Sequence, residues 1–158
     1  MSLVPCRRVR LTGSFTIALP TEQAFVMFTP TGERIWAHGW DPIFPSPSAD
    51  ETEPGTVFRT VHADQESTWT VVRCEAGRSI VYAVAIPAKR CGLVGVACEP
   101  SEEGTRVTVT YDLTALNGES NAELDVFAAN YEPFLSDWER SIAAVIEGKN
   151  NGRPHSFG

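Results

Sequence analysis

The stretch TRVTVTYDLT, residues 105–114, decides the fold because its side chains alternate strictly between two kinds. Large apolar or aromatic residues stand at every second position, and polar residues stand between them: Val107, Val109, Tyr111 and Leu113 form the first set. Successive side chains of a β-strand point to opposite faces of a sheet, so the stretch predicts a strand with one buried and one wet face. The buried face must be covered by another element.

The covering element follows directly, where the spacing of apolar residues changes. Between residues 124 and 145 they recur every three or four positions, which predicts an amphipathic helix of about six turns. Acidic residues crowd its beginning, where the helix dipole favours negative charge. Pro133 falls inside this helix and has no N–H to donate to the carbonyl four residues back, so we expect a kink there.

The N-terminal third of the chain begins with RVRLTGSFTIAL, residues 8–19, which is rich in β-branched and apolar residues and predicts a strand. Pro20 and Glu22 then form a common helix beginning, and Pro30 ends that helix. ERIW, residues 33–36, predicts a second short helix. Residues 42–54 are rich in proline, serine and acidic side chains and predict a loop.

The middle of the chain has four further runs of strand length. Turns short enough for antiparallel hairpins separate them. Alternation in the first run puts Phe58 opposite to Val57 and Val61, and the sequence leaves open which of these faces is inside. The four runs are TVFRTVH, STWTVVRC, SIVYAVAIP and GLVGVACE, at residues 56–62, 67–74, 79–87 and 92–99.

This order of elements predicts one α+β domain over residues 7–147 and a flexible C-terminal tail at 148–158. The domain has a curved antiparallel sheet of about six strands wrapped around the C-terminal helix, with two short helices after the first strand. A helix cannot follow a curved sheet along its whole length, so we expect a gap between the two. That gap is the candidate site.

Charge and composition limit the classes of molecule that the protein is expected to bind. The net charge of −7 and the lack of a dense Lys/Arg cluster argue against nucleic acid. No run reaches the roughly 18 apolar residues of a membrane span, and no targeting signal is visible, so we expect a cytoplasmic protein without membrane insertion. We expect it to be a monomer or a homodimer.

The four cysteines have no spacing typical of metal ligands, and no histidine stands at a suitable distance from them. We interpret them as reduced thiols that act as small apolar residues. No phosphate loop, dinucleotide fingerprint or metal motif is present. The sequence therefore predicts no metal site and no cofactor.

Three pieces of sequence resemble a known superfamily: FTIALPTEQAFVMF at residues 15–28, GTRVTVTYDLTAL at 104–116 and FLSDWERSI at 134–142. The chain resembles the SRPBCC superfamily, which unites START lipid-transfer domains, pollen allergens and polyketide cyclases. The segment ERIWAHGWDPIFPSP, residues 33–47, further resembles a subgroup with a Trp-Asp-Pro turn. The resemblance implies a helix-grip fold, which hosts binding, transfer and catalysis alike.

By that resemblance the cavity should be lined by the inward side chains of the strands and the inner face of the last helix, with two aromatic rings guarding one end. Small residues at 83, 85 and 95 fit a sheet that leaves space. The expected ligand-binding residues are Trp40, Phe44, Trp69, Val71, Ile80, Tyr82, Val84, Val107, Val109, Tyr111, Phe127, Tyr131, Phe134 and Trp138.

Catalytic candidates are few. His38 stands three residues before Asp41, but Asp-Pro favours a turn and no nucleophile motif accompanies the pair. Tyr82, Tyr111 and Tyr131 could act as acid–base groups if their hydroxyls meet in one cavity. Arg59 and Arg73 could bind a carboxylate or phosphate if they face inward, although a solvent-facing arginine is the simpler interpretation.

Three functions fit these residues. The first is binding, with possible transport, of a small hydrophobic or amphipathic ligand in the cavity. The second is an enzyme of the cyclase or dehydratase type that uses the tyrosines or His38. The third is a protein-interaction domain similar to the chaperone activators that resemble this fold. Binding is favoured over catalysis because no catalytic constellation is recognisable.

Overall fold

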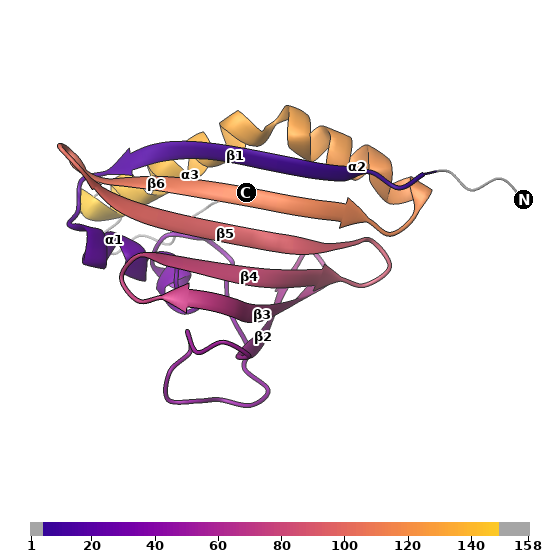
Figure 1. Cartoon of the computed structure of the whole chain (residues 1–158), viewed down its shortest axis with the longest axis horizontal. Helices are drawn as coiled ribbons and strands as arrows, with labels where there is room; N and C mark the ends of the chain where they lie inside the picture. Colours follow the sequence, from indigo (N-terminus) through magenta and orange to yellow (C-terminus); the bar gives the residue numbers. More distant parts are fainter. Residues whose placement is uncertain (1–4, 149–158) are drawn as a thin grey trace, which may run out of the picture.

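The computed structural model describes residues 5–148, and in these the sheet and the helices form two layers (Figure 1). The predicted α+β architecture is confirmed, with six antiparallel strands, two short helices after the first strand and helical cover at the C-terminus. The elements are β1 (Arg8–Ile17), α1 (Thr21–Val26), η1 (Gly32–Ile35), β2 (Val57–His62), β3 (Gln65–Glu75), β4 (Ser79–Ile86), β5 (Arg90–Ser101), β6 (Gly104–Ala115), α2 (Gly118–Ala129) and α3 (Tyr131–Ile146).

The strands lie in the order β1-β6-β5-β4-β3-β2, so the first strand of the chain pairs with the last. Hairpins join β2 through β6 in sequence, as the short turns predicted. β1 is added beside β6 with Phe15 opposite Val107. This pairing brings the N-terminal strand beside the helices that leave β6, and the sheet thereby closes over them on one side (Figure 1).

The C-terminal helix is interrupted, but not where the sequence predicted. The kink expected at Pro133 lies three residues earlier, at Asn130, which separates α2 from α3. Pro133 then falls in the first turn of α3, where backbone N–H groups have no partner within the helix. The missing N–H of proline therefore costs no hydrogen bond at this position. The expected tail, residues 148–158, lies outside the described residues except for Gly148.

The close approach of α3 to β1 depends on Gly13. A Cβ atom at this position would lie 2.5 Å from Cδ1 of Leu135 and 3.5 Å from the ring of Tyr131. Both of those residues are buried. The absence of a side chain at Gly13 therefore lets α3 seat on the edge strand.

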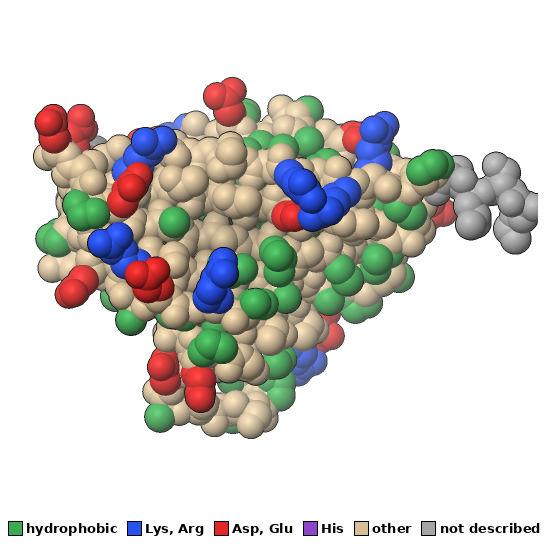
Figure 2. All heavy atoms as spheres, in the orientation of Figure 1, with side chains coloured by type: hydrophobic (Ala, Val, Ile, Leu, Met, Phe, Trp, Pro, Cys, Tyr) green, Lys and Arg blue, Asp and Glu red, His purple; other side chains and the backbone are tan. Residues whose placement is uncertain are grey.

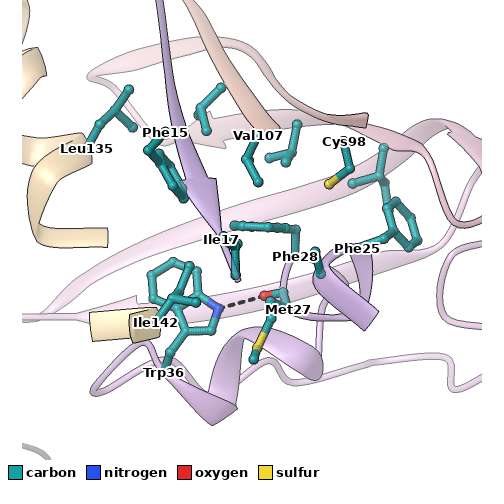
Figure 3. Packing of buried hydrophobic residues seen from close by; sticks show 14 of the residues in the cluster. Phe15, Ile17, Phe25, Met27, Phe28, Trp36, Cys98, Val107, Leu135 and Ile142 are labelled. Atoms are coloured by element: carbon teal, nitrogen blue, oxygen red, sulfur yellow. Dashed lines mark hydrogen bonds between the residues drawn. The ribbon is translucent and has the colours of Figure 1, made fainter. Parts of the chain in front are cut away.

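A solid core fills the end of the molecule near α1, between the sheet and α3. Figure 3 shows Phe28 and Trp36 packed beside residues of β1, β6 and α3, with the Trp36 indole donating a 2.7 Å hydrogen bond to the Met27 carbonyl oxygen. Phe28 is 0% exposed. On β2, Phe58 is also 0% exposed, whereas Val57 and Val61 are 37% and 52% exposed. The face of β2 that carries Phe58 is therefore the inner one.

The other face of the sheet is partly open to solvent, and Figure 2 shows acidic and basic side chains interspersed across one side of the molecule. Ala83, Ala85 and Gly95 alternate with the buried residues of β4 and β5, so they lie on this outer face. A Cβ on Gly95 would contact Val81, another residue of that face. The expectation that these small residues make room for a cavity is therefore wrong.

Candidate functional site

A cavity of about 870 Å³ lies between the inner face of the sheet and α2; we call it the outer cavity. Its walls come from the segment after η1, from β2 to β6, from α2 and from the beginning of α3. The lining residues are Ala37, His38, Gly39, Trp40, Thr60, Val61, His62, Gln65, Ser67, Trp69, Val84, Ile86, Arg90, Val94, Tyr111, Leu113, Ala122, Glu123, Leu124, Val126, Phe127, Asn130 and Phe134. Apolar side chains dominate this set, with polar groups from β2, β3, β5 and α2.

A second cavity of about 220 Å³, the inner cavity, lies on the side of the core. It shares several wall residues with the outer cavity, among them Trp40, Trp69, Val94, Tyr111 and Phe134. The two spaces are therefore neighbours, and one ligand can reach from one toward the other. The remaining lining residues of the inner cavity are Glu33, Trp36, Ala37, Tyr82, Val96 and Trp138.

Aromatic rings enclose the inner cavity from two sides. On the sheet side, the ring centroid of Trp69 lies 5.5 Å from that of Trp40 and 5.9 Å from that of Tyr82, both edge to face. On the helix side, Phe134 lies 5.4 Å from Trp138 and 5.7 Å from Tyr111. Edge-to-face pairs at these distances stabilise one another, so the wall is a rigid aromatic surface.

Four aromatic residues of the inner cavity donate hydrogen bonds to groups that do not line it. The indole N–H groups of Trp36 and Trp40 donate to the carbonyl oxygens of Met27 and Pro30, each at 2.7 Å. The indole of Trp69 donates to Oγ1 of Thr60 at 3.0 Å. The Tyr82 hydroxyl donates to the Phe28 carbonyl oxygen at 2.7 Å. A ligand in the inner cavity therefore meets mainly ring carbon from these four residues.

Glu33 is the one acidic residue among the lining residues of the inner cavity. It is half-buried and lines the inner cavity. Burial raises the pKa of its carboxyl well above the ordinary value. The carboxyl has no hydrogen bond or ion pair within residues 5–148 that would lower that pKa. η1 positions it: Thr29 accepts the Glu33 backbone N–H at 3.1 Å.

The tyrosine candidates for acid–base chemistry divide into two groups. Tyr82 and Tyr131 donate their hydroxyls to the backbone carbonyls of Phe28 and Val109, each at 2.7 Å. Tyr111 lines both cavities. Burial raises the pKa of all three phenols above the usual range, and the charge of Glu33 contributes at Tyr82 and Tyr111. Neutral phenols are therefore expected throughout the pH range in which proteins fold.

His38 follows η1 in the chain. It lines the outer cavity, and its side chain is exposed. The nearby carboxylate of Asp41 is 2.6 Å from the guanidinium of Arg34, so it forms an ion pair there. Arg59 bonds to Glu66 at 2.7 Å, and Arg73 is exposed, in line with the simpler interpretation of both arginines.

The expected ligand-binding residues fall into two places. Those that line a cavity are Trp40, Trp69, Tyr82, Val84, Tyr111, Phe127, Phe134 and Trp138. The structure places the others in the solid core or packed against it: Phe44, Val71, Ile80, Val107, Val109 and Tyr131. Strand alternation identified the inner face correctly, but it does not separate the part of that face under α3, which is filled, from the part near α2, which is not.

Several polar lining residues were not expected from the sequence. Glu33 lies in a short helix without a motif, and His62 is the last residue of β2. Arg90 and Glu123 lie 3.8 Å apart and bring opposite charges to the outer cavity from β5 and α2. Finding Arg90 and Glu123 required the pairing register of β4 with β5 and the orientation of α2 relative to the sheet. The sequence held one indication: Arg90 and the inward-facing Val94 are four residues apart on one strand, so their side chains point to the same face.

The cysteines are free thiols, and burial raises the pKa of Cys98 to about 11. A thiol of this kind is a poor nucleophile. Within residues 5–148, no group of three His, Cys, Asp or Glu side chains is arranged as a metal ion would require. No helix in the same residues has the length and apolar character needed to cross a bilayer.

Sequence comparison connects this architecture to a family. Residues 8–142 match the family described as polyketide cyclase / dehydrase and lipid transport. The chain belongs to this family. The SRPBCC resemblance is thereby confirmed, and the chain is a ligand-binding domain of the SRPBCC type. No functionally curated protein shows a significant sequence match.

Solved structures share the fold of this polyketide cyclase/dehydrase family member. A protein from Rhodobacter sphaeroides superposes with a TM-score of 0.66 at 17% identity, over 89% of this chain and 93% of that chain. CalU16 from Micromonospora echinospora gives 0.57 at 14%, over 90% and 80%. The Aha1 dimer from Colwellia psychrerythraea gives 0.60 at 12%, over 85% and 96%. At these identities the likeness shows the fold alone.

Proposed function

We propose that the protein binds a small hydrophobic or amphipathic molecule in the outer and inner cavities, between the sheet and the C-terminal helices. The observation that carries this proposal is the 870 Å³ outer cavity with its mainly apolar wall. Binding sites for small molecules usually have volumes of about 300–1,000 Å³, apolar walls and a few polar groups. The aromatic wall of the adjoining inner cavity supplies a flat, rigid surface for the apolar part of the ligand.

The polar groups favour an amphipathic ligand. At the outer cavity Glu123 is paired with Arg90 and, more closely, with Lys89, so Arg90 already has an acidic partner. The protein as a whole carries a net charge of −7, which disfavours highly anionic ligands. A ligand with an apolar body and one or two neutral polar groups matches this arrangement. The cytoplasmic location and the monomeric or homodimeric state expected from the sequence belong to the same proposal.

Acid–base catalysis by the tyrosines receives less support. Such a mechanism needs a hydroxyl that is free to exchange a proton with the substrate. Tyr82 and Tyr131 instead donate to backbone carbonyls, which leaves Tyr111 as the one candidate of the three without such a bond, and burial raises the pKa of all three phenols. The binding proposal requires none of these hydroxyls to react.

The proposal is tested by native mass spectrometry of the purified protein and by a thermal-shift screen with fatty acids, quinones, sterol-like and polyketide compounds. A ligand present at 100 times its dissociation constant should raise the free energy of unfolding by about 2.7 kcal/mol. We expect at least one class to do so. A bare protein mass together with no thermal shift in any class would contradict the proposal.

A further inference from the structure

The inner cavity contains one feature that ligand binding by apolar contact does not explain. Its wall consists of aromatic and apolar side chains, and among them lies the carboxyl group of Glu33. An acidic side chain in an apolar environment costs free energy unless it is paired or hydrogen-bonded. No such partner is found for it in the described part of the chain. A leucine at this position would fit the surrounding wall better.

Most donors around the inner cavity are bound elsewhere, and the two others, the Tyr111 hydroxyl and the Trp138 indole N–H, carry no positive charge. The indole N–H groups of Trp36, Trp40 and Trp69 donate away from it, and so does the Tyr82 hydroxyl. The guanidinium of Arg34, which follows Glu33 in the sequence, is bound to Asp41. A buried carboxyl group without a positively charged partner keeps its proton, and its O–H is then itself a donor.

We propose that Glu33 donates a hydrogen bond to a carbonyl oxygen of a neutral, ring-containing ligand that lies against the aromatic wall of the inner cavity. This inference rests on the proposed function and names the ligand class for the same site. The ring system stacks on Trp69 and Trp138, which come from opposite sides of the cavity. The carbonyl oxygen accepts a hydrogen bond from the O–H of Glu33, for which no acceptor is found among residues 5–148.

A cation is the other ligand that an acidic residue among aromatic rings could attract. That arrangement requires the ionised carboxylate, and burial raises the pKa of Glu33 well above its ordinary value. The titratable groups that face Glu33 do not help ionise it, because Tyr82 on β4 and Tyr111 on β6 carry no positive charge. The lining residues from α3 are Phe134 and Trp138, which do not titrate. The neutral ligand is therefore favoured.

The test uses three probes of nearly equal shape: 2-acetylnaphthalene, 2-isopropenylnaphthalene, in which a CH₂ group replaces the carbonyl oxygen, and 2-naphthyltrimethylammonium. Calorimetric titration at pH 6 should show the ketone binding about three to ten times more tightly than the hydrocarbon, the contribution of one hydrogen bond. The carbonyl stretching band of the bound ketone should lie at lower frequency than in hexane. Tighter binding of the cation, increasing with pH, would overturn the proposal.

Two variants separate the roles of the proton and the shape. Glu33→Leu should bind ketone and hydrocarbon equally, because it removes the donor. Glu33→Gln should keep the preference for the ketone, because its amide N–H can donate the hydrogen bond. Its ketone affinity should not fall with rising pH, whereas the affinity of the wild type should fall as Glu33 ionises. His38 and His62 line the outer cavity and remain in both variants, so their contribution cancels in the comparison. Glu53→Gln, on the exposed loop before β2, is the matched control.

The outcomes distinguish the inference from the function on which it rests. If the hydrocarbon binds in the cavity but the ketone has no advantage, or keeps its advantage in Glu33→Leu, the role of Glu33 is disproved and the cavity remains a binding site. If none of the three probes binds the wild type, both are contradicted. If Glu33→Leu does not fold, the pH profiles of wild type and Glu33→Gln still decide, and identical profiles would overturn the proposal.

Discussion

The hydroxyl of Tyr82 donates a 2.7 Å hydrogen bond to the carbonyl oxygen of Phe28, 54 residues away in sequence. This bond ties the centre of β4 to the turn after α1 and gives a buried carbonyl its partner. It also occupies the phenol that the sequence offered as a catalytic group. The ring of Tyr82 forms part of the cavity wall, and the hydroxyl holds that wall to the core.

Replacement Tyr82→Phe should therefore lower stability without lowering affinity. The Phe28 carbonyl would lose its donor in a buried place, which costs about 1–3 kcal/mol. Urea unfolding measures this loss, and calorimetric titration with 2-isopropenylnaphthalene measures the affinity. Tyr111→Phe is the matched control, because that ring also lines the cavities while its hydroxyl has no partner among the described residues. Unchanged stability with abolished binding would show that the Tyr82 hydroxyl serves the ligand instead.

A larger side chain at Val94 should reduce the volume of both cavities. Val94 lies on β5 opposite Tyr82 on one side and Tyr111 on the other, and it lines both cavities. Val94→Phe should fill part of both and weaken probe binding at least tenfold, with little loss of stability because the added ring occupies existing space. Leu93→Phe, the next residue, points to the outer face and is 43% exposed, so it should bind as the wild type does. Equal affinities in both variants would place the binding site elsewhere.

The protonation of Glu33 should be visible in stability alone. Its pKa in the folded protein is raised above the ordinary value of 4.5, so the folded state holds this proton more tightly than the unfolded state. Its contribution is complete below about pH 4.5 and is lost as pH rises through the folded-state pKa, with a slope of up to about 1.4 kcal/mol per pH unit. Urea unfolding from pH 5 to 9 should show the wild type losing stability relative to Glu33→Gln. Parallel profiles would contradict a raised pKa.

The beginning of α2 rests on Asn117. Its side-chain oxygen accepts the Ser120 backbone N–H at 2.9 Å, and its amide donates to the Ala88 carbonyl oxygen at 2.5 Å. Asn117→Ala should cost about 1–2 kcal/mol because it removes this helix cap and the link to the β4–β5 turn. Asn117→Asp keeps the capping oxygen but cannot donate to the Ala88 carbonyl oxygen, so it should preserve the helix cap and lose only the link to the turn. Hydrogen exchange of the α2 amides provides the site-specific readout, and an equal rate in all three proteins would exclude a capping role.

Most of the fold could be predicted from spacing alone. The alternation around Val107 and Tyr111 identified the inner face of β6, and the change of period after it identified the covering helices. The position of the helix break could not be found this way. Proline lacks an N–H and restricts the preceding backbone, but it fits equally inside a kinked helix and in the first turn of a new one, where the structure places Pro133.

The site was harder to predict, because the sequence shows which side chains face inward but not whether they fill the space between sheet and helices. Val71 and Val84 have the same pattern in their strands, yet Val71 is packed in the core and Val84 lines the outer cavity. Glu33 gave no signal at all, since an acidic residue at the beginning of a short helix is common and stabilising at the surface. Only the folded arrangement shows that Glu33 lines the same cavity as the four tryptophans.

All four tryptophans of the sequence line the inner cavity, which makes their indole N–H signals a direct reporter of ligand binding there. The decisive measurement is an NMR titration of ¹⁵N-labelled protein with 2-acetylnaphthalene. We predict that the indole signals of Trp36, Trp40, Trp69 and Trp138 shift together and saturate with one binding constant, while amides of the outer sheet face stay in place. Indole signals that do not move at saturating probe, or shifts confined to the outer face, would contradict the account of the cavity as the binding site.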